Sequence, residues 1–238
     1  MSFVLTGIVF VLALIAGCIS HCLIIRYECI DENENTEESY LAIRDNLAKA
    51  ITRLRDKNNW RQTALVVVAA LLCAATTFKI WDAGVEWIQC IRYMILAVLL
   101  MMAMLVDWNT HKIPNRIVGL ILLLGIVLLV IEFFCDKNDF VTSFVMYGVG
   151  ILACFFLFYI MSKLTNEGMG MGDIKLIAVM GWNMGLSLTL FVVLIALVLS
   201  SVMAMFLLFG KKKNKKEQFP FGPFLFFGYI LMMLFIYF

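Results

Sequence analysis

The sequence has few of the side chains from which most metal and redox sites are built. Only 2 of its 238 residues are histidine, and its 7 cysteines form no C-x-x-C pair. Most of these cysteines lie within apolar runs, where a thiol packs as a small hydrophobe. The pattern therefore indicates neither a zinc site nor a disulfide framework. We expect no metal ion, no cofactor and no nucleic-acid partner.

The first apolar stretch lacks the positive charge of a signal peptide. Ile15-Ala16-Gly17-Cys18 looks like a lipoprotein cleavage box, but no Lys or Arg precedes it. Signal peptides have a positively charged region before the apolar segment. The apolar stretch also continues past Cys18 to Ile25. These features favour a membrane helix over a cleaved leader.

Long uncharged hydrophobic runs occupy most of the chain, which is 63% hydrophobic with a mean hydropathy of +0.95. A run of about 20 apolar residues is long enough to cross a bilayer as a helix. One run, 174–209, is broken by Gly181 and Gly185, so we divide it into a short and a full span. The sequence predicts an all-α bundle of eight transmembrane helices at about 3–25, 63–81, 87–106, 117–134, 141–161, 174–183 (the short sixth), 186–209 and 219–238.

Basic residues are distributed unevenly between the two ends of the predicted spans. Of the 19 Lys and Arg residues, 16 fall in segments 26–61, 112–116, 163–175 and 211–216. The positive-inside rule places these four segments in the cytoplasm and both termini outside. Merging the sixth and seventh spans would move the Lys-rich segment outside. The charge distribution therefore supports eight spans.

The first cytoplasmic segment contains a predicted amphipathic helix over residues 40–57, with apolar residues spaced by three and four. Such a helix lies on the inner leaflet of the bilayer or docks a partner or substrate. We assign residues 1–81 to an N-terminal region with two spans. Residues 87–238 form a second predicted membrane domain.

Two acidic residues adjoin predicted spans, whereas most of the other acids lie in loops. Asp107 follows the third span directly, and Asp173 precedes the sixth. Carboxylates at membrane depth are costly and are candidates for function. Both residues lie at cytoplasmic ends, so we expect them at one level of the bundle.

The residues around each aspartate predict irregular backbone. Glycine occupies every second position in Gly168-Met-Gly170-Met-Gly172-Asp173, a pattern that disfavours helix. It permits unusual dihedrals or the close approach of another segment. After Asp107, Pro114 restricts the conformation of Ile113. We therefore expect Asp173 on unwound chain and Asp107 where a helix ends in a short turn.

Three segments together resemble the type IV prepilin peptidases, which are GxGD-type aspartic proteases of bacterial membranes. The segments are Asp107…Ile-Pro114-Asn115, then Gly170-Met-Gly172-Asp173-Ile-Lys175, then Pro220-Phe-Gly222-Pro223. The resemblance implies that Asp107 and Asp173 are catalytic. It implies structural or substrate-positioning roles for the other positions that match the pattern: Pro114, Asn115, Gly170, Gly172, Lys175, Pro220, Gly222 and Pro223.

The resemblance also implies a substrate and a mechanism. The family removes short basic leaders from pilin-like precursors at the cytoplasmic face of the membrane. Two neighbouring carboxyls share one proton, so one can activate water while the other protonates the carbonyl oxygen. Lys175 has two interpretations, as a charge that biases the shared proton or as an anchor to lipid phosphate.

The chain departs from the larger bifunctional members of the family, which carry paired C-x-x-C motifs and methylate the new N-terminus. It has no such motif, so we expect peptidase activity without N-methyltransferase activity. Three other interpretations stay open. They are a presenilin-like protease, an ion- or proton-coupled transporter with intramembrane carboxylates, and an inactive scaffold of a secretion machine.

Overall fold

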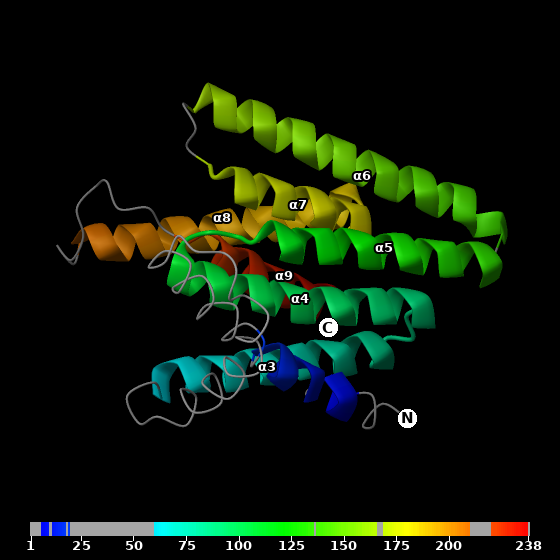
Figure 1. The fold of residues 1–238 in the computed structure, drawn as a ribbon, viewed down its shortest axis with the longest axis horizontal. Helices are drawn as coiled ribbons and strands as arrows, with labels where there is room; N and C mark the ends of the chain where they lie inside the picture. Colours follow the sequence, from blue (N-terminus) through cyan, green and yellow to red (C-terminus); the bar gives the residue numbers. More distant parts are fainter. Residues whose placement is uncertain are drawn as a thin grey trace, which may run out of the picture.

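The computed structural model describes residues 60–135, 137–165, 169–209 and 220–237, together with 6–9, 11–17 and 19 near the N-terminus. The predicted amphipathic helix 40–57, Gly168 and the Lys-rich segment 211–216 lie outside these residues. Helices form almost all of the described chain, and no strand occurs in it (Figure 1). In chain order the helices from residue 60 onward are α3 Trp60–Asp82, α4 Trp87–Thr110, α5 Asn115–Cys135, α6 Lys137–Leu164, α7 Met171–Met184, α8 Leu186–Phe209 and α9 Gly222–Ile236.

Five of these helices are long and apolar enough to cross a membrane, so the chain is an integral membrane protein as predicted. They are the helices α3, α4, α5, α6 and α8, with apolar stretches of 19 to 25 residues. Two further described helices, α7 and α9, have 14 and 15 residues. The total of eight spans stays a prediction, since much of the N-terminal region lies outside the described residues.

The predicted division of the long run 174–209 is confirmed. Helix α7 ends at Met184 and α8 begins at Leu186, with Gly185 between them at a φ of 78°. This left-handed backbone is favoured by glycine, which has no Cβ to clash. At 1.5 Å per residue, the 14 residues of α7 span about 21 Å, which is too short to cross a core of about 30 Å without the shielding of other helices. It is instead surrounded by protein, in contact with α4, α5, α6 and α8.

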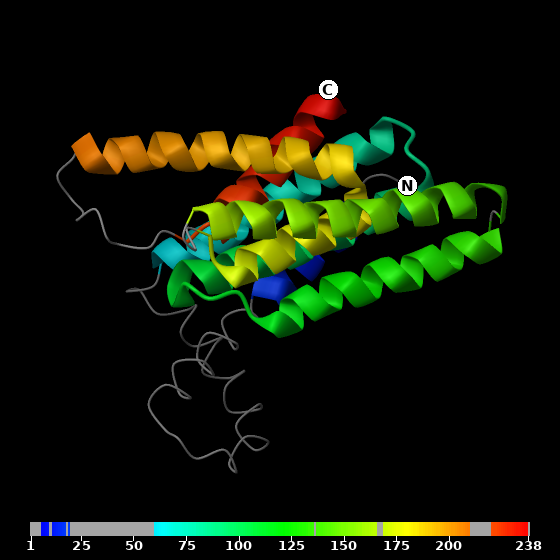
Figure 2. The same cartoon turned by 90° about the horizontal axis from the view of Figure 1, so that it is seen from above.

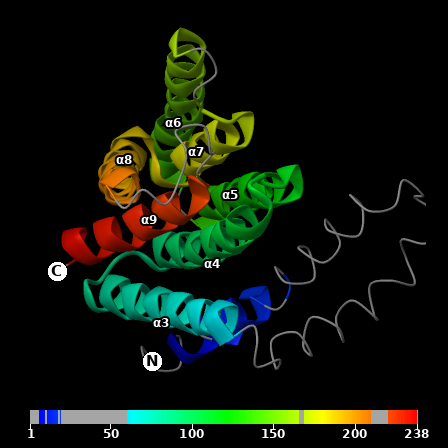
Figure 3. The ribbon, with the colours of Figure 1, turned by 90° about the vertical axis from the view of Figure 1, so that its left-hand side faces the viewer.

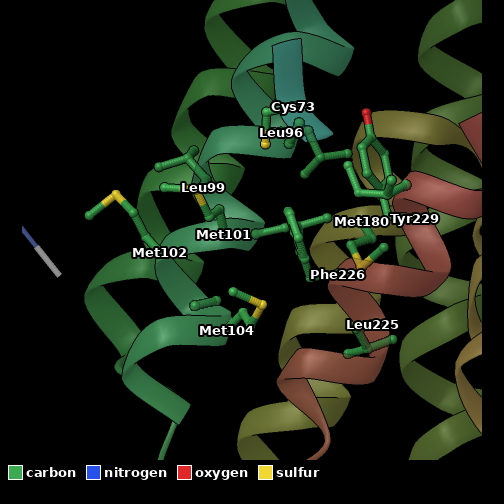
Figure 4. Packing of buried hydrophobic residues seen from close by; sticks show 14 of the residues in the cluster. Cys73, Leu96, Leu99, Met101, Met102, Met104, Met180, Leu225, Phe226 and Tyr229 are labelled. Carbon is green, nitrogen blue, oxygen red and sulfur yellow. The ribbon is translucent and has the colours of Figure 1, made fainter. Parts of the chain in front are cut away.

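Helix α4 lies at the centre of the bundle. Figure 3 shows α3 on one side of α4 and α9, and α6, α7 and α8 on the other. In its most apolar stretch 78% of α4 is buried, compared with 17% for α6. The outer helices α6 and α8 expose large side chains such as Leu152 and Phe191, which suits contact with lipid chains. Figure 4 shows Met101 and Leu96 of α4 beside Phe226 and Tyr229 of α9 in the core.

The backbones of α6 and α7 approach each other closely at Gly150 and Gly181. A Cβ on Gly150 would lie only 2.2 Å from the Gly181 carbonyl oxygen, and a Cβ on Gly181 would lie 2.5 Å from that of Gly150. Small residues allow this kind of helix contact, which is common within membranes. The contact holds α7 against α6.

We expect Gly150→Ala to destabilise the bundle by about 1–3 kcal/mol, because overpacking forces the two backbones apart. Gly148→Ala is the matched control, since a Cβ there meets nothing within 4 Å. Unfolding of the purified protein by titration with denaturing detergent measures both effects. Equal stability of the two variants would contradict the close contact.

A buried ion pair joins α4 to α5 at the end of the bundle away from Asp107. Arg92 donates from its guanidinium to Glu132 at 2.8 Å, and its side chain is 1% exposed. Ser143 on α6 donates to the other oxygen of Glu132 at 2.6 Å, and the guanidinium lies 4.2 Å from the centre of the Tyr147 ring. Arg92 is one of the three basic residues outside the four segments assigned to the cytoplasm, so charge counting places it on or near the outer side. The structure places its side chain inside the bundle instead.

Candidate active site

Asp107 lies within α4 and not at its end. The helix continues to Thr110, and Asp107 is 4% exposed. The polar residues that follow extend the helix, because Asn109 and Thr110 donate to the carbonyls of Leu105 and Val106 at 2.8 and 2.9 Å. His111 then ends it at a φ of 51°. The predicted helix end after residue 106 was therefore one turn too early.

Asp173 also lies on a helix, which corrects the prediction of unwound chain. Helix α7 begins at Met171, after Gly170 in an extended conformation. Gly172 and Asp173 thus occupy the first helical turn. Glycine lowers helix stability little in the first turn, because the first N–H groups of a helix have no intrahelical partner. An acidic residue in this turn is stabilised by the helix dipole.

The glycines before Asp173 allow neighbouring atoms to approach the backbone closely, which is the second of the two roles predicted for them. A Cβ on Gly172 would lie 3.2 Å from the Cβ of Ile113, in the segment between α4 and α5. A Cβ on Gly170 would lie 3.2 Å from a carboxylate oxygen of Asp173. Side chains at these positions would push the α4–α5 connection and the carboxylate away.

The two aspartates are at the same end of the bundle, where α4 ends and α7 begins (left in Figures 1 and 2). Asp173 lies in the first turn of α7, just before the predicted sixth span. Burial raises the pKa of Asp173 to about 7, and the charge of Asp107 contributes to the increase. The backbone of Gly170 acts in the opposite direction. A carboxyl with this pKa can carry a proton near neutral pH.

The start of α9 binds the carboxylate of Asp107. The backbone N–H of Gly222 donates to Oδ2 of Asp107 at 2.7 Å, across 115 residues of sequence. Pro223 follows in the first turn, where a missing N–H costs nothing, and half-buried Pro220 precedes the helix. Sequence reasoning gave Gly222 a structural or positioning role, but the contact with Asp107 emerged only from the fold.

Lys175 and Asn115 connect α7 to the start of α5. The Lys175 ammonium donates to Oδ1 of Asn115 at 3.2 Å. Pro114 is buried just before Asn115, and its carbonyl accepts from the N–H of Ile117 at 3.0 Å. The contact with Asn115 was absent from both interpretations of Lys175. Within the described residues, no cluster of three or more His, Cys, Asp or Glu side chains could hold a metal ion.

Comparison with known proteins finds a family similarity in the region that contains both aspartates. Residues 94–205 match the model of the type IV leader peptidase family. The match covers α7 with Asp173 and most of α4 with Asp107, and ends before α9. No solved structure gave a significant match.

Several curated proteins are similar to the chain over this region. A prepilin leader peptidase/N-methyltransferase of Xanthomonas campestris is 26% identical over 160 residues, covering 67% of the chain and 53% of the relative. The enzyme of the same description from Stutzerimonas stutzeri is 29% identical, covering 61% and 49%, and that from Pseudomonas putida is 28% identical, covering 79% and 62%. The chain thus spans about half to three fifths of the length of these relatives.

Proposed function

We propose that the protein is an aspartic endopeptidase that removes the leader peptide of type IV pilin-like or pseudopilin precursors. One observation carries the proposal: the buried carboxyl of Asp107 and the half-buried carboxyl of Asp173 lie near enough for the charge of Asp107 to raise the pKa of Asp173, within a region that matches the leader peptidase family. Similarity to prepilin leader peptidases supports the substrate class.

The chemistry requires the pair to share one proton. The ionised carboxylate takes a proton from water, and the water oxygen attacks the scissile carbonyl carbon. The protonated carboxyl donates its proton to the carbonyl oxygen. When the resulting diol collapses, the C–N bond breaks, the amine leaves with the proton taken from water, and the second carboxyl regains its own. Neither aspartate is consumed, and no metal or cofactor is needed.

The active site is proposed to face the cytoplasm of a bacterial inner membrane. Support comes from basic residues at the end of the bundle where α4 and α6 end and α7 begins (Figure 1). They are Lys112, Lys163 and Lys175. A leader that stays in the cytoplasm while its hydrophobic helix enters the membrane reaches a site at this depth. The bilayer and the precursor are the proposed partners.

Cleavage by the full-length chain in sealed vesicles tests the activity and its orientation together. With an epitope-tagged pilin precursor, we expect cleavage in inverted inner-membrane vesicles, whose cytoplasmic face is outward. In right-side-out vesicles, precursor added from outside should remain intact. Cleavage confined to right-side-out vesicles would reverse the proposed orientation.

Mass spectrometry of the mature product tests for N-methyltransferase activity, the second activity in the names of the relatives. We expect an unmethylated N-terminus when S-adenosylmethionine is supplied, because the sequence has no C-x-x-C motif. A bifunctional relative assayed in parallel provides the positive control. A product heavier by one methyl group, about 14 Da, would contradict the expectation.

A further inference from the structure

The first turn of α9 offers a single well-placed amide to Asp107. The N–H of Gly222 donates to Oδ2 at 2.7 Å. The next residue, Pro223, has no N–H, and the N–H of Phe224 donates to the carbonyl of Phe221 at 3.0 Å. Asp107 thus caps a helix that follows it by more than a hundred residues. The hydrogen bond engages one of the two carboxylate oxygens, Oδ2.

Only glycine allows the backbone of α9 to come this close. A Cβ at position 222 would lie 2.8 Å from Oδ2 of Asp107 and 3.0 Å from its Cβ. Asp107 is buried in α4 among apolar residues such as Val106 and Met104 and cannot move aside freely. The absence of a side chain at position 222 is therefore part of how the carboxylate is held.

The surroundings of Asp107 and Asp173 stabilise the ionised carboxylate to different extents. An N–H donor stabilises the ionised form of the carboxylate that it bonds, and the N-terminal end of the 15-residue helix α9 adds a partial positive charge. At Asp173 burial raises the pKa most, the charge of Asp107 raises it further, and the backbone of Gly170 opposes both effects. The shared proton is therefore favoured on Asp173.

We propose that Gly222 is a positioning residue that holds Asp107 ionised, so that Asp107 accepts the proton of the attacking water and Asp173 protonates the carbonyl oxygen. This assignment rests on the proposed peptidase function. Oδ1 of Asp107 accepts one proton from water while the water oxygen bonds to the carbonyl carbon. That proton later passes to the leaving amine, and Asp107 returns to its ionised form against the amide of Gly222.

The other charged and titratable groups around Asp107 do not change the expectation that the shared proton lies on Asp173. The exposed His111 follows the last residue of α4, four residues after Asp107, and Asp173 lies on α7. Lys112 and Arg116, between α4 and α5 and at the start of α5, are exposed to solvent. Helix α9 carries no charged side chain, so its effect on Asp107 comes from the backbone alone.

An amide-to-ester change at position 222 tests the proposal with no added side chain. The full-length chain is translated in vitro into lipid nanodiscs with glycolic acid in place of Gly222, which removes the N–H. Cleavage of a pilin precursor is then followed against pH. We expect the ascending limb of the kcat/KM profile to move up by about one pH unit, since loss of a charge-assisted hydrogen bond penalises the ionised form. The descending limb should stay in place. An unmoved ascending limb would overturn the proposal.

Gly222→Ala and Gly228→Ala form a matched pair that separates positioning from stability. Both residues lie on α9, and a Cβ on either would meet an oxygen at 2.8 Å, that of Asp107 or the carbonyl of Val192 on α8. We expect both variants to lower stability but only Gly222→Ala to shift the ascending limb. A shift of similar size in Gly228→Ala would assign the effect to general destabilisation.

Infrared titration in the Asp173→Asn background measures ionisation of Asp107 without substrate. The carboxyl C=O band of Asp107, identified with labelled aspartate, should disappear about one pH unit higher in the ester variant. The same midpoint in both proteins would overturn the role of Gly222. Absence of cleavage by the wild-type chain, with the infrared shift present, would refute the peptidase function and the base assignment but leave the role of the amide intact.

Discussion

Replacing either Asp107 or Asp173 with asparagine is expected to lower kcat for precursor cleavage by about 10²–10⁴-fold, the usual contribution of a positioned acid or base. Asparagine keeps the shape of the side chain but can neither accept the proton of water nor donate one from a carboxyl. Because the two groups act as a unit, the double variant should lose little more than either single variant. Single-turnover cleavage in nanodiscs measures each rate.

Asp82→Asn is the matched control for these variants. It makes the same chemical change at an exposed residue, at the far end of α3 from the site. Its rate should equal that of the wild type. Normal cleavage by Asp107→Asn or Asp173→Asn would refute the catalytic pair. Loss of activity in Asp82→Asn would indicate an effect on the fold instead of on the chemistry.

Removing one partner of the Arg92–Glu132 pair is expected to destabilise the protein by about 3–5 kcal/mol, because a buried charge is left without its counterion. The side chain of Arg92 is 1% exposed, and that of Glu132 is 10% exposed. Among the described residues, Arg92→Met leaves Glu132 with the hydroxyl of Ser143 as its hydrogen-bond donor, at 2.6 Å. Steric trapping in bilayers or unfolding in denaturing detergent measures the change in free energy.

The double variant Arg92→Met with Glu132→Leu distinguishes a lost ion pair from lost packing. Apolar replacement of both partners of a buried pair is often neutral or stabilising, so much of the stability should return. Arg116→Met, at an exposed residue on α5, should change stability by less than about 0.5 kcal/mol. Additive losses in the double variant would contradict a direct coupling between Arg92 and Glu132.

Sequence patterns predicted the helices of the described region well because lipid imposes a simple rule. A backbone in hydrocarbon must satisfy its own hydrogen bonds, so long apolar runs become helices. The break near Gly185 was predictable because a run of that length exceeds one crossing. Helix ends were predicted less well. Hydropathy places the end of α4 where polar residues begin, whereas Asn109 and Thr110 bond back to the helix and extend it.

The sequence by itself determined the membrane class, the helical architecture and the two aspartates as candidates, because hydropathy, glycine spacing and charge are local properties of the chain. Only the tertiary structure decided which backbone amide meets Asp107 and where the buried charge of Arg92 is compensated. The contacts of Gly222 with Asp107 and of Arg92 with Glu132 span 115 and 40 residues. Such contacts depend on how helices pack, and no local pattern specifies them.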